Sequence, residues 1–173
     1  MDAALIRALA KTLGNVPGDV IEIGVYQGDS AALLCELFPD RTVYLFDTFC
    51  GMPKTGPLDG HREGNFRNTS VETVEKTLSK HENYETHAGL FPDTAAAAEG
   101  RTFCFAHIDC DLQKSVWDSC EFCYPRMESG GIMMLDDYGY GACRGAKVAV
   151  DEFFADKPEP LNHRGKRVFV LKR

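Results

Sequence analysis

The chain has 173 residues and a mass of 19.2 kDa, a length that suits one domain with a sizeable core. Hydrophobic residues make up 44% of it and charged residues 26%, as in ordinary globular proteins. The formal net charge is -7, which disfavours non-specific binding to nucleic acid or anionic lipid because both would repel the chain. We therefore expect a single domain over residues 1–173 and no nucleic-acid partner.

Apolar runs and cysteines indicate the compartment. No apolar run reaches the roughly 18 residues that a membrane span needs, and the N-terminal segment does not resemble a secretory signal. The seven cysteines are odd in number and scattered, which favours buried free thiols over a disulfide framework. Cys120 and Cys123 form a CxxC, but it lies in a helical pattern and lacks a second ligand pair for zinc. We expect a cytoplasmic protein without a membrane partner.

Short apolar runs alternate with helical patterns through the first half of the chain. An amphipathic helix is expected to end near Gly14, and a further helix is expected to begin after Thr69 or Ser70. Between them the pattern predicts strands at 19–23 and 42–46, a helix at 30–38 and, after the second helix, a weak strand at 84–87. The stretch 51–68 is rich in Gly and Pro, and its length is typical of a binding loop.

The second half continues the alternation and ends differently. A helix is predicted over the alanine run Ala95–Ala98, and further elements are predicted as a strand at 102–108, a helix at 115–124, a strand at 131–135 and a helix at 142–154. Two last strands flank a turn at Arg164 and Gly165. Alternation implies parallel strands with helices on both faces, whereas the closing hairpin must be antiparallel. A mostly parallel seven-stranded sheet of this kind is the outline of the Rossmann-like class I methyltransferase fold.

The turn after the first strand carries the features of a nucleotide-type site. Gly24 and Gly28 allow a sharp turn and a close approach of the backbone to a ligand. The G-x-G-x-x-G pattern of dinucleotide sites is absent, and Glu22 suits an amino group or a water network. Asp47 ends the second strand, about 20 residues further on, where an acid accepts hydrogen bonds from ribose hydroxyls. The alternative for Asp47 is a turn cap.

Two further strands end in carboxylates. Asp109 and Asp111 follow the fourth strand, and Asp136 and Asp137 follow the fifth, so all four are expected at the same crevice. They would repel one another unless a cation lay between them, and oxygen ligands favour Mg²⁺, with Mn²⁺ or Ca²⁺ as alternatives. Such an ion would orient a substrate oxygen and lower its pKa. The competing interpretation is that Asp111 and Asp137 cap helices.

Two histidines are considered for a role in the site. His107 lies within the fourth strand, and we expect it to pack in the interior. His163, near the hairpin turn, is a weaker candidate for a base that reaches the crevice.

Seven segments in order resemble the macrocin-type O-methyltransferases, which act on sugars of macrolide and aminocoumarin antibiotics and on related glycosides. The segments are EIGVYQGDS (22–30), FDTFCGMP (46–53), NTSVETV (68–74), GLFPDT (89–94), HIDCDL (107–112), YPRMESGG (124–131) and DDYG (136–139) followed by CRGAKVAVDEF (143–153). Gln113 and Lys114 depart from the family, whose members usually carry an aromatic residue and an acid there.

The resemblance implies an S-adenosylmethionine-dependent O-methyltransferase acting on a hydroxyl of a sugar or other small molecule, with the long loop closing over the substrate. A homodimer is compatible with it. The implied cofactor contacts are Glu22, Gly24, Gly28, Ser30 and Asp47, with Thr48 and Gly89 beside them in the matching segments. The implied Mg²⁺ ligands are Asp109, Asp136 and Asp137, and Asp109 doubles as catalytic base.

Other functions stay open at this point. HIDCDL and LDDYG resemble the acidic motifs of metal-dependent aspartyl phosphatases, although the D-x-D strand there normally comes first in the chain. A non-catalytic adenosylmethionine-binding protein is the second alternative, although it would not need an intact acid cluster. A catechol-like diol as acceptor would use the same metal chemistry as a sugar.

Overall fold

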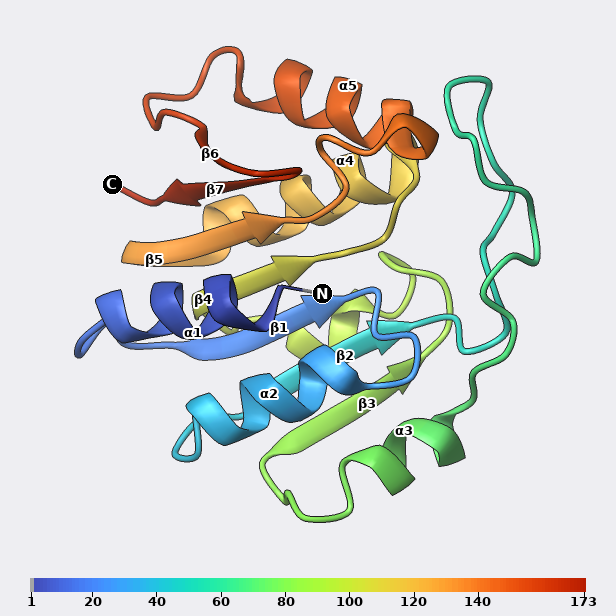
Figure 1. The fold of residues 1–173 in the computed structure, drawn as a ribbon. Helices are drawn as coiled ribbons and strands as arrows, with labels where there is room; N and C mark the ends of the chain where they lie inside the picture. Colours follow the sequence, from blue (N-terminus) through green and yellow to red (C-terminus); the bar gives the residue numbers. More distant parts are fainter. Residues whose placement is uncertain (1) are drawn as a thin grey trace.

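The computed structural model describes residues 2–173. They contain a seven-stranded sheet in the order β3-β2-β1-β4-β5-β7-β6, with helices on both faces (Figure 1). The first five strands are parallel, and β7 runs antiparallel between β5 and β6, which confirms the predicted class I methyltransferase fold. The strands are β1 (Asp19–Ile23), β2 (Val43–Asp47), β3 (Tyr84–Ala88), β4 (Phe103–Ile108), β5 (Met127–Leu135), β6 (Asn162–Arg164) and β7 (Arg167–Leu171).

The two faces of the sheet have separate cores because the helices divide between them. One face packs against α1 (Ala3–Thr12), α2 (Asp29–Leu37) and α3 (Val71–Thr77). The other packs against α4 (Gln113–Cys123), α5 (Arg144–Phe154) and the 3-10 turn η1 (Ala95–Ala98). Asp2 caps α1 through the amide of Leu5, and Ser70 caps α3 through the amide of Thr73, one of the two caps predicted there. No helix within residues 2–173 has the length and apolar composition to cross a membrane.

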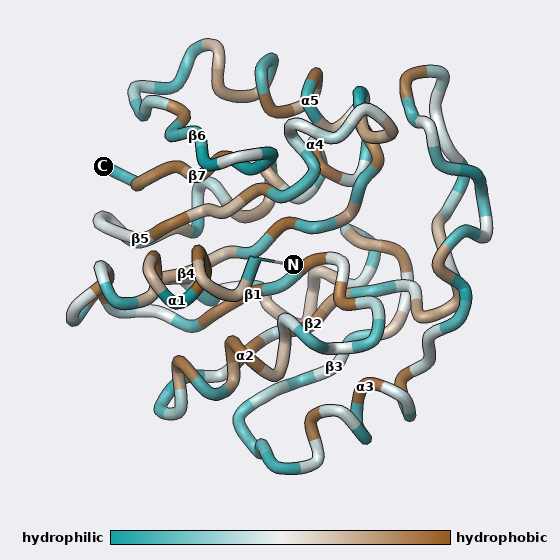
Figure 2. The backbone as a smooth tube through the Cα atoms, viewed as in Figure 1, coloured by the Kyte–Doolittle hydropathy of each residue, from teal (hydrophilic) through white to brown (hydrophobic). Residues whose placement is uncertain are grey.

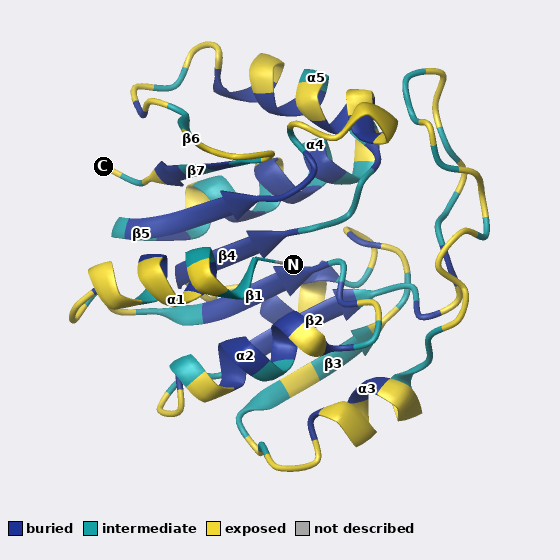
Figure 3. Ribbon diagram, in the orientation of Figure 1, coloured by how far each residue is buried: buried dark blue, intermediate teal, exposed yellow. Residues whose placement is uncertain are grey.

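Burial follows from this double cover. Every residue of β4 is buried, as expected for a central parallel strand with helices on both sides. Hydrophobic stretches lie along the central strands, and exposed residues gather on the outer sides of the helices and on the long loop (Figures 2 and 3). The cysteines are free thiols, and Cys120 and Cys123 are buried on α4, as the helical pattern predicted.

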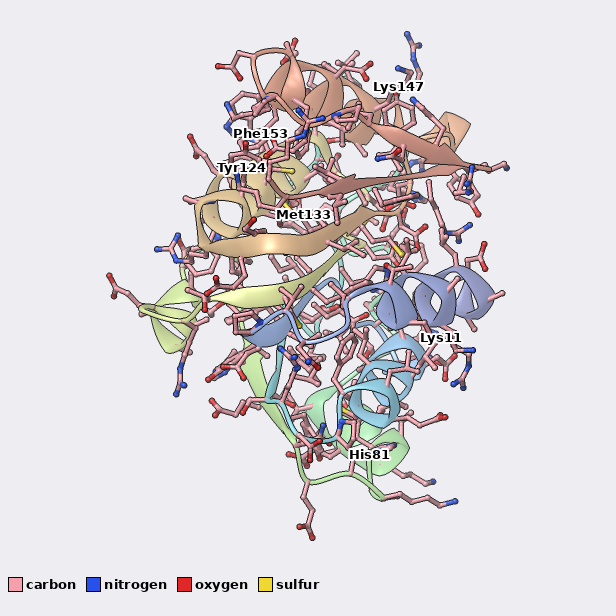
Figure 4. The ribbon with its side chains drawn as sticks, turned by 90° about the vertical axis from the view of Figure 1, so that its left-hand side faces the viewer. Lys11, His81, Tyr124, Met133, Lys147 and Phe153 are labelled. Carbon is pink, nitrogen blue, oxygen red and sulfur yellow. The ribbon has the colours of Figure 1, made fainter. Side chains whose placement is uncertain are left out.

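The C-terminal hairpin is attached to the helical layer at a buried carboxylate. Glu159 accepts hydrogen bonds from the Tyr124 hydroxyl at 2.7 Å and from Lys172 Nζ at 3.2 Å. The Tyr124 ring packs on Phe153 of α5, with ring centroids 5.7 Å apart, and the two side chains are neighbours above the strands (Figure 4). This contact joins the last residues of the chain to α5.

One predicted element is wrong. The alanine run Ala95–Ala98 forms a single 3-10 turn instead of an α-helix. Only seven residues separate Pro92 from the positive-φ Gly100, too short a span to offset the cost of nucleating an α-helix, whatever the propensity of alanine. Ala95 and Ala98 are buried against the sheet, so the small side chains serve close packing.

Candidate active site

The glycine turn after β1 depends on two residues with positive φ, Gly24 at 91° and Gly28 at 89°. A Cβ on Gly24 would overlap the backbone carbonyl of Asp109 at the end of β4. A Cβ on Gly28 would lie 3.3 Å from Val74 of α3. Gly24 therefore permits close approach of two strand ends, whereas Gly28 permits packing of α3 against the turn.

Asp47 holds this turn from the end of β2. Its Oδ2 accepts hydrogen bonds from the amides of Val25 and Tyr26, both at 2.8 Å, and its Oδ1 accepts one from the amide of Phe49 at 2.9 Å. Asp47 also lines the adjacent cavity. The structure thus combines the two roles weighed for this residue, a turn cap and a side chain at the ligand cavity.

A cavity of about 300 Å³ opens at the C-terminal ends of β1, β2 and β4, beside the long loop. Five predicted cofactor residues line it, namely Gly24, Ser30, Asp47, Thr48 and Gly89. Glu22 and Gly28 do not line it. Glu22 is fully buried and faces His107, and Gly28 faces α3, so the contact of either residue with a cofactor stays a prediction.

The lining of the cavity also contains acidic and apolar residues. Asp109 and Asp111 are among them, so the cavity joins the glycine turn to the acid cluster. Tyr26, Met52, Phe66 and Leu90 also line it. Sequence reasoning did not identify these four, because an apolar residue in a loop gives no signal of its own.

Burial and mutual repulsion raise the pKa values of two carboxyl groups in the acid cluster. Burial raises the pKa of Asp109 to about 6, with repulsion from Asp136 adding to the effect and His107 opposing it. Burial, together with repulsion from Asp109 and Asp111, raises the pKa of Asp137 to about 9. At neutral pH Asp137 therefore holds a proton in place of a cation, whereas Asp109 is largely ionised. A divalent ion among them would remove that penalty.

His107 lies at the base of this cluster. It is fully buried, as predicted, with Nδ1 2.7 Å from Glu22 Oε1 and Nε2 3.5 Å from Asp136 Oδ2. Burial would lower its pKa, but Asp136 and Glu22 outweigh burial and raise it to about 10. Arg167 Nε also contacts Asp136. Burial would raise the pKa of Asp136, and the two cations bring it below its usual value.

The residues present fit a hard divalent cation. Candidate ligand atoms of His107, Asp109 and Asp136 lie within 4.8 Å of one another. Both carboxylate oxygens of Asp136 are buried and lack a well-formed hydrogen bond among the described residues, although Arg167 Nε contacts Oδ1 and His107 Nε2 contacts Oδ2. Asp137 lies outside this group, and its Oδ2 accepts a hydrogen bond from the Asp111 amide at 3.2 Å.

Two alternatives that the sequence left open find no support in the contacts. Neither Asp111 nor Asp137 caps the helix that follows it, since α4 and α5 have no side-chain cap, and the amide of Gln113 donates to Asp59 Oδ1 of the long loop at 2.9 Å. His163 is exposed on β6 and packs against Tyr138 with ring centroids 5.3 Å apart. It belongs to neither group of candidate metal ligands within the described residues.

Residues 4–163 match the family described as Macrocin-O-methyltransferase (TylF). The chain belongs to the macrocin O-methyltransferase family. The predicted resemblance is thereby confirmed, and the glycine turn, the cavity and the acid cluster all lie within the matched residues.

Individual macrocin O-methyltransferase relatives agree with this assignment. Demethyldecarbamoylnovobiocin O-methyltransferase of Streptomyces niveus is 33% identical over 159 residues, covering 82% of this chain and 60% of the relative. Mycinamicin III 3''-O-methyltransferase of Micromonospora griseorubida is 31% identical over 151 residues, covering 76% and 59%. The chain thus spans about three fifths of the length of these relatives. The structure of the O-methyltransferase NovP superposes with a TM-score of 0.85 at 28% identity, covering 98% of this chain and 78% of that one.

Proposed function

We propose that this member of the macrocin O-methyltransferase family is an S-adenosylmethionine-dependent, Mg²⁺-dependent enzyme that methylates a hydroxyl of a sugar or another small molecule. One observation carries the proposal. A single cavity is lined both by the glycine turn with Asp47, here called the cofactor wall, and by Asp109 of the acid cluster, here called the acceptor wall. A methyl donor and a metal-held acceptor would meet in such a cavity.

The residues divide the work between the two walls. The bound cofactor would supply an electrophilic methyl carbon, and a bound Mg²⁺ would polarise the acceptor oxygen and lower its pKa. Asp47 keeps the glycine turn in shape through the amides of Val25 and Tyr26, and Gly24, Ser30, Thr48 and Gly89 complete the cofactor wall.

At the acid cluster, Asp109 and Asp136 are the proposed metal ligands that the structure brings together, and Asp137, which lies outside that group, is proposed as a third. Asp109 also takes the hydroxyl proton, because it is the carboxylate of this set that lines the cavity. Tyr26 and Phe66 pack edge to face at 5.5 Å and present partly exposed rings beside the cavity. Aromatic rings of this kind offer an apolar surface to a sugar or an aromatic acceptor.

The chemistry of the relatives supports a sugar hydroxyl as acceptor. A third relative, from Streptomyces olivaceus, is a 4'-O-methyltransferase of a dimethoxy-rhamnosyl tetracenomycin and is 30% identical over 150 residues. The name of the Micromonospora enzyme likewise specifies a 3''-oxygen. The phosphatase alternative loses its basis, because HIDCDL follows the fourth strand of a methyltransferase-type sheet and the chain matches a methyltransferase family.

The first test is calorimetric titration of the purified chain with S-adenosylhomocysteine, with and without Mg²⁺. We expect micromolar binding that Asp47→Ala abolishes and that Asp136→Ala leaves intact, because Asp136 does not line the cavity. Asp156→Ala, at an exposed position after α5, is the matched control for loss of a carboxylate. Absence of binding under every condition would refute the proposal.

Methyl transfer then separates an enzyme from a non-catalytic binding protein. The chain is incubated with radiolabelled S-adenosylmethionine and a panel of deoxysugar glycosides and catechols, with and without a chelator. We expect Mg²⁺-dependent labelling of a glycoside, lost in Asp136→Ala and in Asp109→Asn although both still bind S-adenosylhomocysteine. Binding without transfer to any acceptor would favour the non-catalytic alternative.

A further inference from the structure

A second group of potential metal ligands lies beside the acid cluster, where the long loop meets the segment that follows β4. It joins His61 of the loop, Asp111 after β4 and Cys143 of the short turn η3 (Gly141–Cys143). His61 Nε2 lies 3.4 Å from Asp111 Oδ1 and 3.7 Å from Cys143 Sγ. Cys143 Sγ lies 3.3 Å from the same oxygen of Asp111. Donor atoms from three distant segments therefore form a closed triangle.

This triangle differs from a catalytic Cys-His-Asp relay. In a relay the acid and the nucleophile contact different nitrogens of the imidazole. Here Asp111 and Cys143 both contact Nε2 of His61, so the three atoms face a common point. A tetrahedral zinc ion with ordinary bond lengths would separate such sulfur, nitrogen and oxygen ligands by roughly 3.3–3.6 Å. The observed separations of 3.3, 3.4 and 3.7 Å correspond to three edges of that tetrahedron.

The loop is held at this place by contacts that do not involve the triangle. Asp59 accepts a hydrogen bond from the amide of Gln113 at 2.9 Å, and the amide of Gly60 donates to the carbonyl of Ala142 at 2.7 Å. A Cβ on Gly60 would lie 2.7 Å from that carbonyl oxygen, so only glycine allows this approach. The residue next in the chain is His61, which is thereby delivered to Cys143 before any ion binds.

We propose that His61, Asp111 and Cys143 bind a borderline transition metal, with zinc as the principal occupant, at a site separate from the Mg²⁺ site. Imidazole and thiolate donors select zinc over Mg²⁺, and the ion ties the long loop to the sheet beside the cavity. Binding releases the thiol proton of Cys143 to solvent. The side chains of His61 and Asp111 are 22% and 20% exposed, which leaves a path for the ion and for a fourth ligand. The proposal rests on ligand geometry and does not depend on methyl transfer.

The test titrates the full chain with Zn²⁺ against a chromogenic chelator, in excess Mg²⁺ so that hard-cation sites are filled. We expect one tightly bound Zn²⁺ per chain, and with Co²⁺ in its place a thiolate-to-cobalt charge-transfer absorption. His61→Gln and Cys143→Ser each remove a direct ligand, so the loss of affinity should exceed the roughly 10–100-fold caused by losing a supporting partner. The matched controls His163→Gln and Cys50→Ser, both at exposed positions, should bind Zn²⁺ like the parent.

Two results would overturn the proposal. One is a Co²⁺ complex without the thiolate band. The other is Zn²⁺ binding that survives in His61→Gln and Cys143→Ser but disappears in Asp136→Asn, which would locate the ion in the acid cluster. Cys143 is buried, so circular dichroism must show that its variant is folded, while the partly exposed His61 provides an independent variant. Binding of S-adenosylhomocysteine, measured in the same samples, keeps failure of this site distinct from failure of the proposed function.

Discussion

The backbone carbonyl of Asp109 lies against the Cα of Gly24 so closely that a side chain at Gly24 has no room. The amide of Asp109 donates to the carbonyl of Ile23 at 2.9 Å. Main-chain contacts therefore fix the turn on the cofactor wall to the first carboxylate of the acid cluster. A side chain at Gly24 would therefore displace the main chain of Asp109 as well as the glycine turn.

Gly24→Ala is expected to abolish binding of S-adenosylhomocysteine and to lower the free energy of unfolding by at least about 2 kcal/mol, because it combines overlap with positive φ. Gly14→Ala is the matched control. Gly14 also has positive φ, at 54°, but open space surrounds it, so the substitution should cost about 1 kcal/mol and leave binding unchanged. Urea denaturation and calorimetry measure the two effects. Unaltered binding by Gly24→Ala would contradict the role given to this contact.

His107→Gln is expected to destabilise the chain by about 3–5 kcal/mol, since it leaves Glu22 buried without its cation and leaves Asp136 with Arg167 alone. Because the pKa of His107 is raised to about 10, its contribution is complete below the unfolded value of about 6.5 and is lost as the pH rises through about 10. The difference from the parent should thus be larger at about pH 6 than near pH 10. Urea denaturation at both pH values measures it.

The double variant Glu22→Gln/His107→Gln provides the control for that pair. It removes the buried charge of Glu22, so it should be more stable than His107→Gln alone. If the effect of the double variant equals the sum of the effects of Glu22→Gln and His107→Gln, the two side chains do not interact energetically.

Glu159→Gln tests the anchor of the C-terminal hairpin. Burial alone would raise the pKa of Glu159, but hydrogen bonds from Tyr124, the Arg173 amide and Lys172 outweigh it and lower the pKa to about 2. A lowered pKa stabilises the fold above the unfolded value of about 4.3, and this contribution is lost as the pH falls towards about 2. We expect the variant to lose about 2 kcal/mol near pH 7 and progressively less below about pH 4.

Denaturant midpoints across that pH range provide the measurement for Glu159. Glu152→Gln, at an exposed position on α5, is the control and should match the parent throughout. A Glu159→Gln difference that stays constant from neutral to acidic pH would refute the charged anchor.

Mg²⁺ affinity is expected to increase with pH. In the metal-free chain the pKa of Asp109 is raised to about 6 and that of Asp137 to about 9, so an incoming ion must displace protons. Between these two values affinity should rise by up to about tenfold per pH unit, with proton release. Calorimetry in two buffers of different ionisation enthalpy counts the protons. Asp137→Asn should flatten the upper part of the curve, and an affinity independent of pH would exclude Asp137 from the site.

Most of the fold followed from the sequence because its signals are local. Apolar runs marked the strands, Ser70 marked the start of α3, and Gly165 marked the closing hairpin. The alanine run Ala95–Ala98 misled because intrinsic propensity is weaker than the length limit imposed by Pro92 and Gly100. Pro92 and Gly100 lie outside the four alanines, so the alanine run alone does not reveal this limit on helix length.

The candidate site was predictable where it depends on strand ends and unpredictable where it depends on side-chain direction. Asp47 and Asp109 were located because each closes a strand that ends at the cavity. Glu22 was assigned to the cofactor, yet its side chain turns toward His107 on the neighbouring strand. The contact between His61 and Cys143 joins segments 82 residues apart, and no spacing pattern in the sequence predicts it.

The attachment of the long loop at Asp59 and Gly60 also bears on its motion. A segment held at its centre behaves as two short loops, and each half has its own, smaller conformational entropy to lose. Gly51 and Met52 belong to one half and Phe66 to the other, and both halves line the cavity. One half can therefore open while the other stays closed. Exchange of the proposed cofactor and acceptor would then be governed by two local openings instead of the movement of one rigid cover.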